Sequence, residues 1–529
     1  MMSRAFAARP ACVLSSLFIA AGVALATPGA SAQADTYVDE VNSLFKAIPT
    51  ARRSDLVLLP VLVKTAPAPG RVSLRDDAAL LPASAADFAS AAEWVKAPAQ
   101  QEALKVLANI TREGEWTKAY AFAQPYGADL VEPALVRDGA YTELGDPPTL
   151  AAAQHLYFPL LDRLVCLANV EATRLAASGD PAAGLDVLTN LVFFGRQMVD
   201  RPFAKEAVWG LDTMSQALER IRDLAYQDMT GPRALGTDRL RGVLQRLADG
   251  GYTDLTRRGF PIGDRAGTDQ ILARVYASAG PVDAAVFAPT MAKLGSASEP
   301  LRLFAESSRW TSAASMQADG KRAREAAKGI YEDWNARWGA DWFDKRQSLQ
   351  PEQERLNRQT LAAVFQSTPD MAPLVNARQI TRTELVGTRA SLAVIGYTYT
   401  QKILPSQLSA VRPLWIPTIE NDPFNVDRRG GPQSWMTFMV PKRDTPKNER
   451  GEAVPYEIDV VTRDPAYPVK RAFTDDTFIM VSTGSNYERD FAKYNQNTIK
   501  KLDKPADYLI FPPVISLQRE VMIARDALK

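Results

Sequence analysis

The stretch from Thr149 to about Asp228 constrains the fold most, because its apolar residues recur at the spacing of three and four that marks one face of a helix. The motif Gly179-Asp180-Pro181 interrupts this pattern. Glycine suits the end of one helix, aspartate caps the next, and proline fits a first turn. We therefore expect an antiparallel helical hairpin whose first helix runs from Thr149 to Ser178, with a third helix after Arg201-Pro202.

Helical spacing also marks much of the chain on either side of this stretch. A long helix is expected over residues 378–404, and the tail is expected to end in a helix from Ser516. The motif Gly145-Asp146-Pro147-Pro148 is the strongest helix breaker of the first half and predicts a boundary. The expected segments are a mixed helical region over 35–145, a helical domain over 146–377, and a long helix with a small sheet and a final helix over 378–529.

Three short runs near the C-terminus are rich in β-branched and aromatic residues, as strands are. They are Trp435–Val440, Tyr456–Val461 and Thr477–Ser482. Their connections are short and polar, which favours antiparallel pairing over helical crossovers. The predicted fold class is therefore mainly α: many helices in the N-terminal and central regions, and a small antiparallel β-sheet (α+β) module near the C-terminus.

The N-terminus has the layout of a secretory signal peptide. Arg4 and Arg9 precede an apolar run from Val13 to Ala26, and small residues follow, so that cleavage fits after Ala32 or after Ala34. The run is shorter than the ~20 residues that span a bilayer, and no later segment is apolar enough to do so. We expect a signal peptide over 1–34 and export to the periplasm or the extracellular space; the alternative is an uncleaved membrane anchor.

Cysteine and histidine are scarce enough to limit the possible chemistry. Removal of the leader would delete Cys12 and leave Cys166 alone, so no intrachain disulfide could form. Cys166 is expected to be a buried small apolar residue, and the alternative is a free reactive thiol. His155 is the only histidine. A metal site rich in His and Cys is thus excluded by count, whereas a Ser-His-Asp triad is not. We expect His155 to be a packed or partly exposed helix residue.

The charge balance argues against nucleic acid as a partner. The full chain carries a formal charge of +1, and the loss of two leader arginines would bring it to about −1. Binding to nucleic acid requires a large basic surplus. The partners expected are instead a protein or a cell-surface component, with no transmembrane span after signal cleavage.

The region from Arg378 to Gly484 resembles the pseudopilin-type tail of many exported bacterial proteins. The shared layout is a helix, a Leu-Pro pair, an Asp-Pro-aromatic turn, and strands ending in Ser-x-Gly, seen here as Leu404-Pro405, Asp422-Pro423-Phe424 and Ser482-Thr483-Gly484. The resemblance implies a helix packed on a small sheet and supplies no activity. Likewise, the hairpin around Gly179 is similar to a single tetratricopeptide-type unit, with no second copy at a regular period.

Four oxygen-bearing residues cluster in the same Asp-Pro-aromatic turn: Glu420, Asp422, Asn425 and Asp427. Calcium takes 6–8 oxygen ligands, and such a loop could donate several, although the spacing is not that of an EF-hand. Major pseudopilins are similar in having a calcium loop in this general region. The alternative is a turn in which Asn and Asp side chains bond the backbone without a metal. No other cofactor is expected.

Trp334, Trp338 and Trp342 recur every four residues and therefore share one face of a helix. If exposed, they could stack on sugar rings or hold a partner; if buried, they belong to the core.

No arrangement of residues identifies an activity. The leading hypothesis is a non-enzymatic envelope protein in which a helical scaffold presents the C-terminal module and acts through binding. The alternative is an exported carboxylate-based hydrolase that acts on glycans and uses the tryptophan face as a platform. Exposure of the three tryptophans beside two carboxylates about 5–10 Å apart would favour the hydrolase, and their burial would remove its platform.

Overall fold

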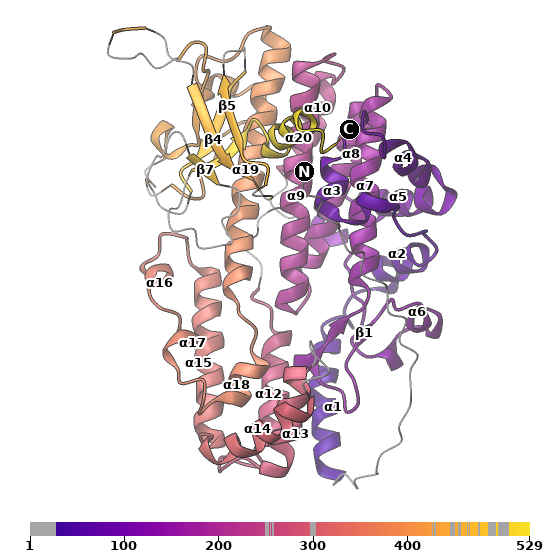
Figure 1. Ribbon diagram of the computed structural model, residues 1–529, viewed down its shortest axis with the longest axis vertical. Helices are drawn as coiled ribbons and strands as arrows, with labels where there is room; N and C mark the ends of the chain where they lie inside the picture. Colours follow the sequence, from indigo (N-terminus) through magenta and orange to yellow (C-terminus); the bar gives the residue numbers. More distant parts are fainter. Residues whose placement is uncertain are drawn as a thin grey trace, which may run out of the picture.

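The computed structural model describes residues 28–248, 253, 255, 259–296, 303–425, 427, 430–444, 450–452, 456–462, 464, 466–473, 477–484, 493–495 and 507–528. Most of the predicted signal peptide, residues 1–27, lies outside this part. Helices dominate, and the strands gather near the C-terminus, so the mainly α prediction with a small β module is confirmed (Figure 1). Among the described residues, no helix combines the length and the apolar character needed to cross a membrane.

Four long helices form the centre of the molecule. They are α7 (Phe158–Ala177), α8 (Pro181–Val199), α9 (Ala204–Thr230) and α19 (Ala372–Gln401), and each packs on the next in this order. The backbones of α8 and α9 meet at two glycines: a Cβ on Gly210 would lie 2.6 Å from the carbonyl oxygen of Gly195. Only glycine permits so close an approach of two helices.

The predicted hairpin is formed by α7 and α8. Gly179 has a φ of +91°, a conformation that glycine adopts without strain, and the Asp180 side chain accepts a 3.0 Å hydrogen bond from the backbone N–H of Ala183. The predicted start at Thr149 is wrong, since α7 begins at Phe158. Pro159 occupies the first turn of α7, where its missing N–H costs nothing.

The residues between Thr149 and α7 are held by tertiary contacts that compete with helix formation. Gln270 accepts a 2.8 Å hydrogen bond from the backbone N–H of Leu150. The next residues form β2 (Gln154–His155), which pairs antiparallel with β1 (Thr142–Glu143). His155 is therefore packed as expected, but in a strand rather than in a helix.

Shorter helices cover these four on both sides. Near the N-terminus, α3, α4 and α5 pack on α7, while α10 packs on α19. Their bounds, with those of neighbouring helices, are α1 (Pro28–Ser43), α2 (Ser54–Leu62), α3 (Arg75–Leu80), α4 (Phe88–Lys96), α5 (Pro98–Ile110), α6 (Pro133–Arg137) and α10 (Thr237–Leu247).

A second group of helices forms the lower lobe in Figure 1, and α19 extends from this lobe into the upper one. The group comprises α12 (Gly263–Val275), α13 (Ala284–Ser296), α14 (Leu303–Ala313), α15 (Gly320–Gly339), α16 (Lys345–Ser348), α17 (Glu352–Arg355) and α18 (Ala362–Ser367). The helix α1 packs on α12 and so joins the start of the described chain to this lobe. One continuous apolar core nevertheless contains residues from Leu58 to Phe511.

The C-terminal strands form two three-stranded sheets rather than one. The first has the order β3 (Thr437–Met439), β6 (Ile479–Ser482), β8 (Tyr508–Phe511), and the second has the order β5 (Val469–Phe473), β4 (Tyr456–Val461), β7 (Lys493–Asn495). All pairings are antiparallel except that of β4 with β7. The helix α20 (Val514–Ala524) contributes Val514 and Leu517 to the apolar cluster that both sheets share, and that shared cluster explains why the two sheets stay together.

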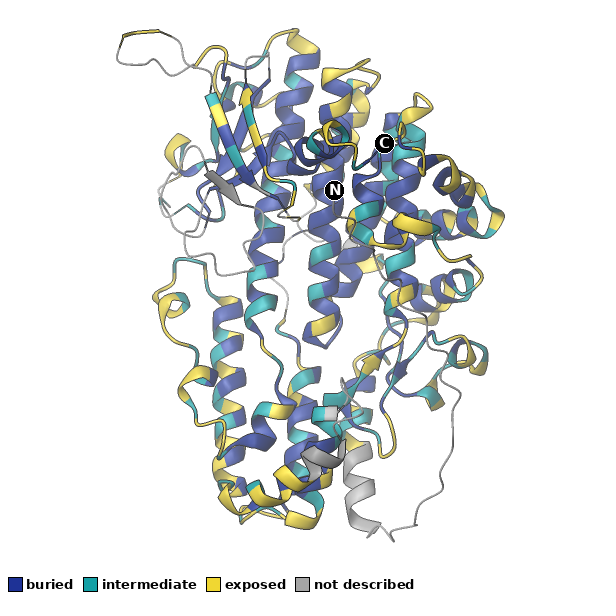
Figure 2. Cartoon of the chain, viewed as in Figure 1, coloured by how far each residue is buried: buried dark blue, intermediate teal, exposed yellow. Residues whose placement is uncertain are grey.

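The core of the molecule contains charged side chains as well as apolar ones, and Figure 2 shows α9 dark along most of its length. Arg222 illustrates how these charges are tolerated. Its guanidinium lies 2.5 Å from a carboxylate oxygen of Glu384 and donates to the backbone oxygen of Ile510 at 3.0 Å. Buried ions persist in proteins when they are paired and hydrogen-bonded in this way, and these contacts tie α9 to α19 and β8.

Candidate functional site

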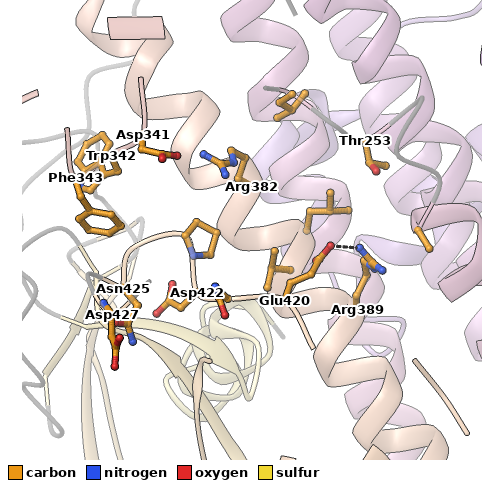
Figure 3. A pocket seen from close by; sticks show the side chains of 16 residues that line it. Thr253, Asp341, Trp342, Phe343, Arg382, Arg389, Glu420, Asp422, Asn425 and Asp427 are labelled. Atoms are coloured by element: carbon orange, nitrogen blue, oxygen red, sulfur yellow. Dashed lines mark hydrogen bonds and ion pairs between the residues drawn. The ribbon is translucent and has the colours of Figure 1, made fainter. Parts of the chain in front are cut away.

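A cleft of about 540 Å³ lies beside the middle of α19, between the end of α15 and the turn that follows Glu420 (Figure 3). It brings together the two groups of residues that the sequence singled out, since Trp342 and the oxygen-bearing turn both line it. The complete lining comprises Ala248, Thr253, Leu255, Asp341, Trp342, Phe343, Arg382, Leu385, Val386, Arg389, Glu420, Asn421, Asp422, Pro423, Asn425 and Asp427. We call it the interlobe cleft.

Of the three predicted tryptophans, only Trp342 reaches this cleft. Trp334 and Trp338 are 5% and 3% exposed and belong to the core. Trp334 donates its indole N–H to Gln353 at 3.1 Å, and the guanidinium carbon of Arg378 lies 4.5 Å from the centre of a Trp338 ring. Because α15 ends at Gly339, Trp342 lies beyond the helix and does not share its buried face.

Trp342 is half-buried and anchored by the oxygen-bearing turn itself. Its ring meets that of Phe424 edge to face, with 5.3 Å between the ring centroids and 84° between the planes. This geometry matches the quadrupoles of two aromatic rings. The pair therefore connects the end of the tryptophan series to the turn, across about eighty residues of sequence.

Asp422 holds the turn against the sheet. Its Oδ1 accepts hydrogen bonds from the backbone N–H of Phe424 at 3.0 Å and from the hydroxyl of Ser482 at 2.7 Å, while its Oδ2 accepts from the backbone N–H of Thr483 at 2.9 Å. Burial raises the pKa of Asp422, and these donors oppose that shift. Asp422 thus acts as a structural anchor between the turn and the end of β6.

The other oxygen-bearing residues of the turn also have protein partners. Glu420 pairs with Arg389 at 2.6 Å, as the dashed line in Figure 3 marks. Asn425 accepts a 2.9 Å hydrogen bond from the backbone N–H of Asp427 and donates to the backbone oxygen of Gln433 at 2.9 Å. Asp422 and Asn425 both bond the backbone N–H two residues ahead, which is the Asx-turn geometry considered for this segment.

These contacts bear on the calcium prediction. Oxygens of Glu420, Asp422 and Asn425 already accept protein hydrogen bonds or an ion pair, and within the described ranges no group of three carboxylate, histidine or cysteine side chains is placed to hold a metal. The hydrogen bonds of the two Asx turns account for the shape of the loop without a metal. Calcium binding here stays a prediction.

Arg382 and Arg389 are among the cleft residues that sequence reasoning missed. They lie seven positions apart on α19 and so face the same side, two turns from each other. That spacing was readable in the sequence, but nothing in it indicated that the turn after Glu420 would fold back against this side of α19.

Two N–H groups at the cleft lack acceptors. The indole Nε1 of Trp342 and the guanidinium Nε of Arg389 are both out of solvent reach, and neither has a hydrogen-bond partner. An unsatisfied buried donor is costly. Because neither N–H group is open to the cleft, the side chains that a ligand could meet there include the ring of Trp342 and the charged groups of Arg382, Asp341 and Asp427.

His155 and Cys166 lie in the interior, away from these groups. His155 Nδ1 is 3.6 Å from Glu206, which also accepts hydrogen bonds from Arg201 at 2.8 Å and from the hydroxyl of Tyr126 at 2.6 Å. Burial lowers the pKa of His155 to about 4, so its ring is neutral near pH 7. Cys166 is buried as predicted, and burial raises the pKa of its thiol to about 12, which leaves it unreactive.

No known protein family, no curated protein and no solved structure matches this chain.

Proposed function

We propose that this protein is an exported, non-enzymatic binding and scaffolding protein of the cell envelope, and that its interlobe cleft holds a polyhydroxylated ligand such as a segment of glycan. The helical frame would position the cleft and present the small C-terminal sheets to a protein or surface partner. The observation that carries the proposal is the ring of Trp342, fixed edge to face by Phe424 at the edge of a cleft that is otherwise lined by polar and charged side chains.

A sugar matches this lining. Its hydroxyl groups form hydrogen bonds with charged side chains, and its C–H face packs on an aromatic ring. Trp342 supplies such a ring, fixed in place by Phe424, and Phe343 lies beside it. Preorganised aromatic groups of this kind lose little conformational freedom when a ligand binds.

A second candidate is the glycan hydrolase. The cleft that Trp342 lines also contains the carboxylates of Asp341, Glu420 and Asp427. A glycan hydrolase requires such carboxylates beside its sugar-binding ring. Against it, Trp334 and Trp338 are buried, so two of the three rings of the expected platform are lost. Asp422 is committed to backbone and hydroxyl donors, and Glu420 is paired with Arg389. Binding without turnover therefore has the stronger support.

The test is a titration of the purified chain with soluble peptidoglycan fragments and with chitotetraose, followed by tryptophan fluorescence and calorimetry. We expect saturable binding that Trp342→Ala weakens at least about tenfold, as loss of a stacked aromatic anchor does. Trp435→Ala is the matched control, because Trp435 is also half-buried but lies outside the cleft.

Two results would contradict the proposal. If no glycan binds, or if both tryptophan variants bind as the wild type does, the cleft is not a glycan site. Release of reducing ends during the same incubation, abolished by substitution of Asp341 or Asp427 with Asn, would favour the hydrolase instead.

A further inference from the structure

The helix α2 has an inverted distribution of polar and apolar residues. Its only two polar residues, Ser54 and Asp55, are both buried. The hydroxyl of Ser54 donates to Gln197 at 2.6 Å, and Asp55 accepts from the backbone N–H of Ala123 at 3.0 Å. A helix at the surface of a protein normally turns its polar residues to water. Because those of α2 point inward, its outer side has only apolar side chains to present.

This outer side is open in the isolated chain. Leu56 and Val57 are 41% and 42% exposed, and Pro60 and Val61 are half-buried. Leu56 and Pro60 are four positions apart, as are Val57 and Val61, so all of them lie along one face. The inner side packs on α5 and α7 (Figure 1). It carries three fully buried leucines: Leu58, Leu59 and Leu62.

Exposed apolar side chains are concentrated in the segment that contains α2. Eleven large apolar side chains are exposed among the described residues. Four of them lie within residues 44–74: Leu44, Leu56, Val57 and Leu74. Singly exposed apolar residues are ordinary on protein surfaces, whereas adjacent ones on one face, as on α2, mark a contact surface.

The same segment carries a surplus of positive charge. Residues 46–75 contain six basic residues and one acidic residue, whereas the formal charge of the whole chain is +1. The single acid, Asp55, is already paired with Arg53 at 2.7 Å. Lys46, Lys64 and Arg71 are exposed, and Lys64 lies two positions beyond the end of α2. The apolar face is therefore bordered by exposed basic side chains.

The elements that pack beside α2 do not cancel this charge. Residues 98–121, which include α5, contain three acidic and three basic residues. Two of these acids form ion pairs with lysines of the same stretch: Glu102 with Lys105, and Glu115 with Lys118. On α7, Arg163 donates to the backbone oxygen of Thr65 at 2.7 Å and adds a guanidinium beside the end of α2.

We propose that the outer face of α2 binds the surface of a membrane that contains anionic phospholipids. Leu56, Val57 and Val61 would enter the boundary between the headgroups and the acyl chains, as the apolar faces of interfacial helices do. The exposed lysines would keep their ammonium groups among the lipid phosphates. This surface is separate from the interlobe cleft and does not depend on the function proposed for that cleft.

The positive charge decides between the occupants that an apolar face admits. A second copy of the chain, docked symmetrically, would place the same basic residues against each other, and like charges across an interface are unfavourable. An anionic lipid surface attracts them instead, and basic side chains beside an apolar helix face are typical of helices that lie in the plane of a membrane.

The test is sedimentation of the full chain with vesicles that contain phosphatidylcholine and phosphatidylglycerol in equal amounts, compared with vesicles of phosphatidylcholine alone. We expect binding to the anionic vesicles at least about tenfold tighter than to the neutral ones, because several basic residues act together. High salt should weaken this binding, since it screens exposed charges.

The apolar face is tested by the double variant Leu56→Ser with Val57→Ser. It should weaken binding to the anionic vesicles at least about tenfold, because the side chains that enter the membrane are lost. The matched control, Met316→Ser with Leu349→Ser, removes two apolar side chains that are 57% and 54% exposed in the lower lobe. It should bind as the wild type does.

The charge is tested by Lys64→Gln, a surface change that also guards against a loss of folding in the double variant. It should weaken binding about fivefold, which is what one basic residue near an anionic surface contributes. The matched control is Lys321→Gln, which removes the same charge from an exposed position on α15 and should leave binding unchanged.

Three vesicle results would overturn the proposal: no binding to the anionic vesicles, equal binding to the neutral ones, or equal binding by the α2 double variant and its control. Size-exclusion chromatography without lipid examines the other occupant. Elution of the wild type as a dimer, and of the α2 double variant as a monomer, would assign the face to a second copy of the chain and would also overturn the proposal.

Discussion

Trp342 and Phe424 meet edge to face with their ring centroids 5.3 Å apart, and this contact joins the end of α15 to the turn that lines the interlobe cleft. Aromatic pairs of this kind contribute about 0.5–1.5 kcal/mol beyond the area they bury. A double-mutant cycle with Trp342→Ala and Phe424→Leu should therefore give a coupling energy of about 1 kcal/mol in urea unfolding. Additive effects of the two substitutions would mean that the rings do not support each other.

The close approach of α8 and α9 makes a second prediction. A Cβ on Gly210 would lie 2.6 Å from a backbone oxygen, so Gly210→Ala must push two central helices apart. We expect it to lower the free energy of unfolding by about 1–3 kcal/mol, as overpacked cores do. The matched control is Gly242→Ala in α10, where a Cβ meets nothing within 4 Å; it should stabilise the protein by about 0.5–1 kcal/mol. Equal effects at both positions would contradict the helix contact.

Two buried titratable groups near Glu206 should influence stability with opposite dependence on pH. Burial raises the pKa of Asp264 to about 7, so its contribution to stability is fully present below its unfolded pKa of about 3.9 and is lost as pH rises through 7. Burial lowers the pKa of His155 to about 4, so its contribution is present above about pH 6.5 and is lost as pH falls through 4.

Urea unfolding between pH 4 and pH 8 tests this opposition. Relative to the wild type, Asp264→Asn should gain stability as pH rises from 4 to 7, because it removes a contribution that falls with pH; the asparagine oxygen can still accept from the backbone N–H of Ala204. His155→Gln should gain stability, relative to the wild type, as pH falls from 6.5 to 4. If the stability differences of both variants change in the same direction with pH, the opposite pKa shifts of Asp264 and His155 are wrong.

The hydrogen bonds of the turn at Asp422 lead to a prediction about calcium. Because its oxygens already accept from Ser482 and Thr483, removal of calcium with EGTA should change Tm by less than about 1 °C, whereas loss of a bound ligand at a hundredfold excess over Kd would cost about 2.7 kcal/mol. Asp422→Asn should destabilise the protein by about 1–3 kcal/mol with or without the chelator, since the NH2 group that replaces one carboxylate oxygen cannot accept a hydrogen bond. A large shift of Tm with EGTA would instead establish the calcium site.

The sequence alone predicted those elements of the fold that are determined by residues close together in the chain. Gly179 and Asp180 ended and capped the helices of the hairpin as expected, and Tyr456–Val461 formed a strand with the predicted bounds. Local rules failed at Thr149, where Gln270 and a short strand pairing compete with the helix. Tertiary contacts of this kind override propensity and leave no pattern within one segment.

The cleft was harder to predict because it is assembled from distant segments. Trp342 was predicted to share one helical face with Trp334. The helix α15 ends before Trp342, which therefore lies at the cleft instead. The burial of the charged residues of α9 could not be predicted from the sequence either. Charged residues on a helix usually face solvent, and burial here depends on partners such as Glu384 on α19.

The central claim, that the interlobe cleft is the ligand site, is tested most directly by a crystal structure of the full chain soaked with a peptidoglycan fragment. We predict a sugar ring stacked on Trp342, with hydroxyl groups within hydrogen-bond distance of the charged side chains that line the cleft. A fragment bound elsewhere on the molecule, with the cleft filled only by water, would contradict the account.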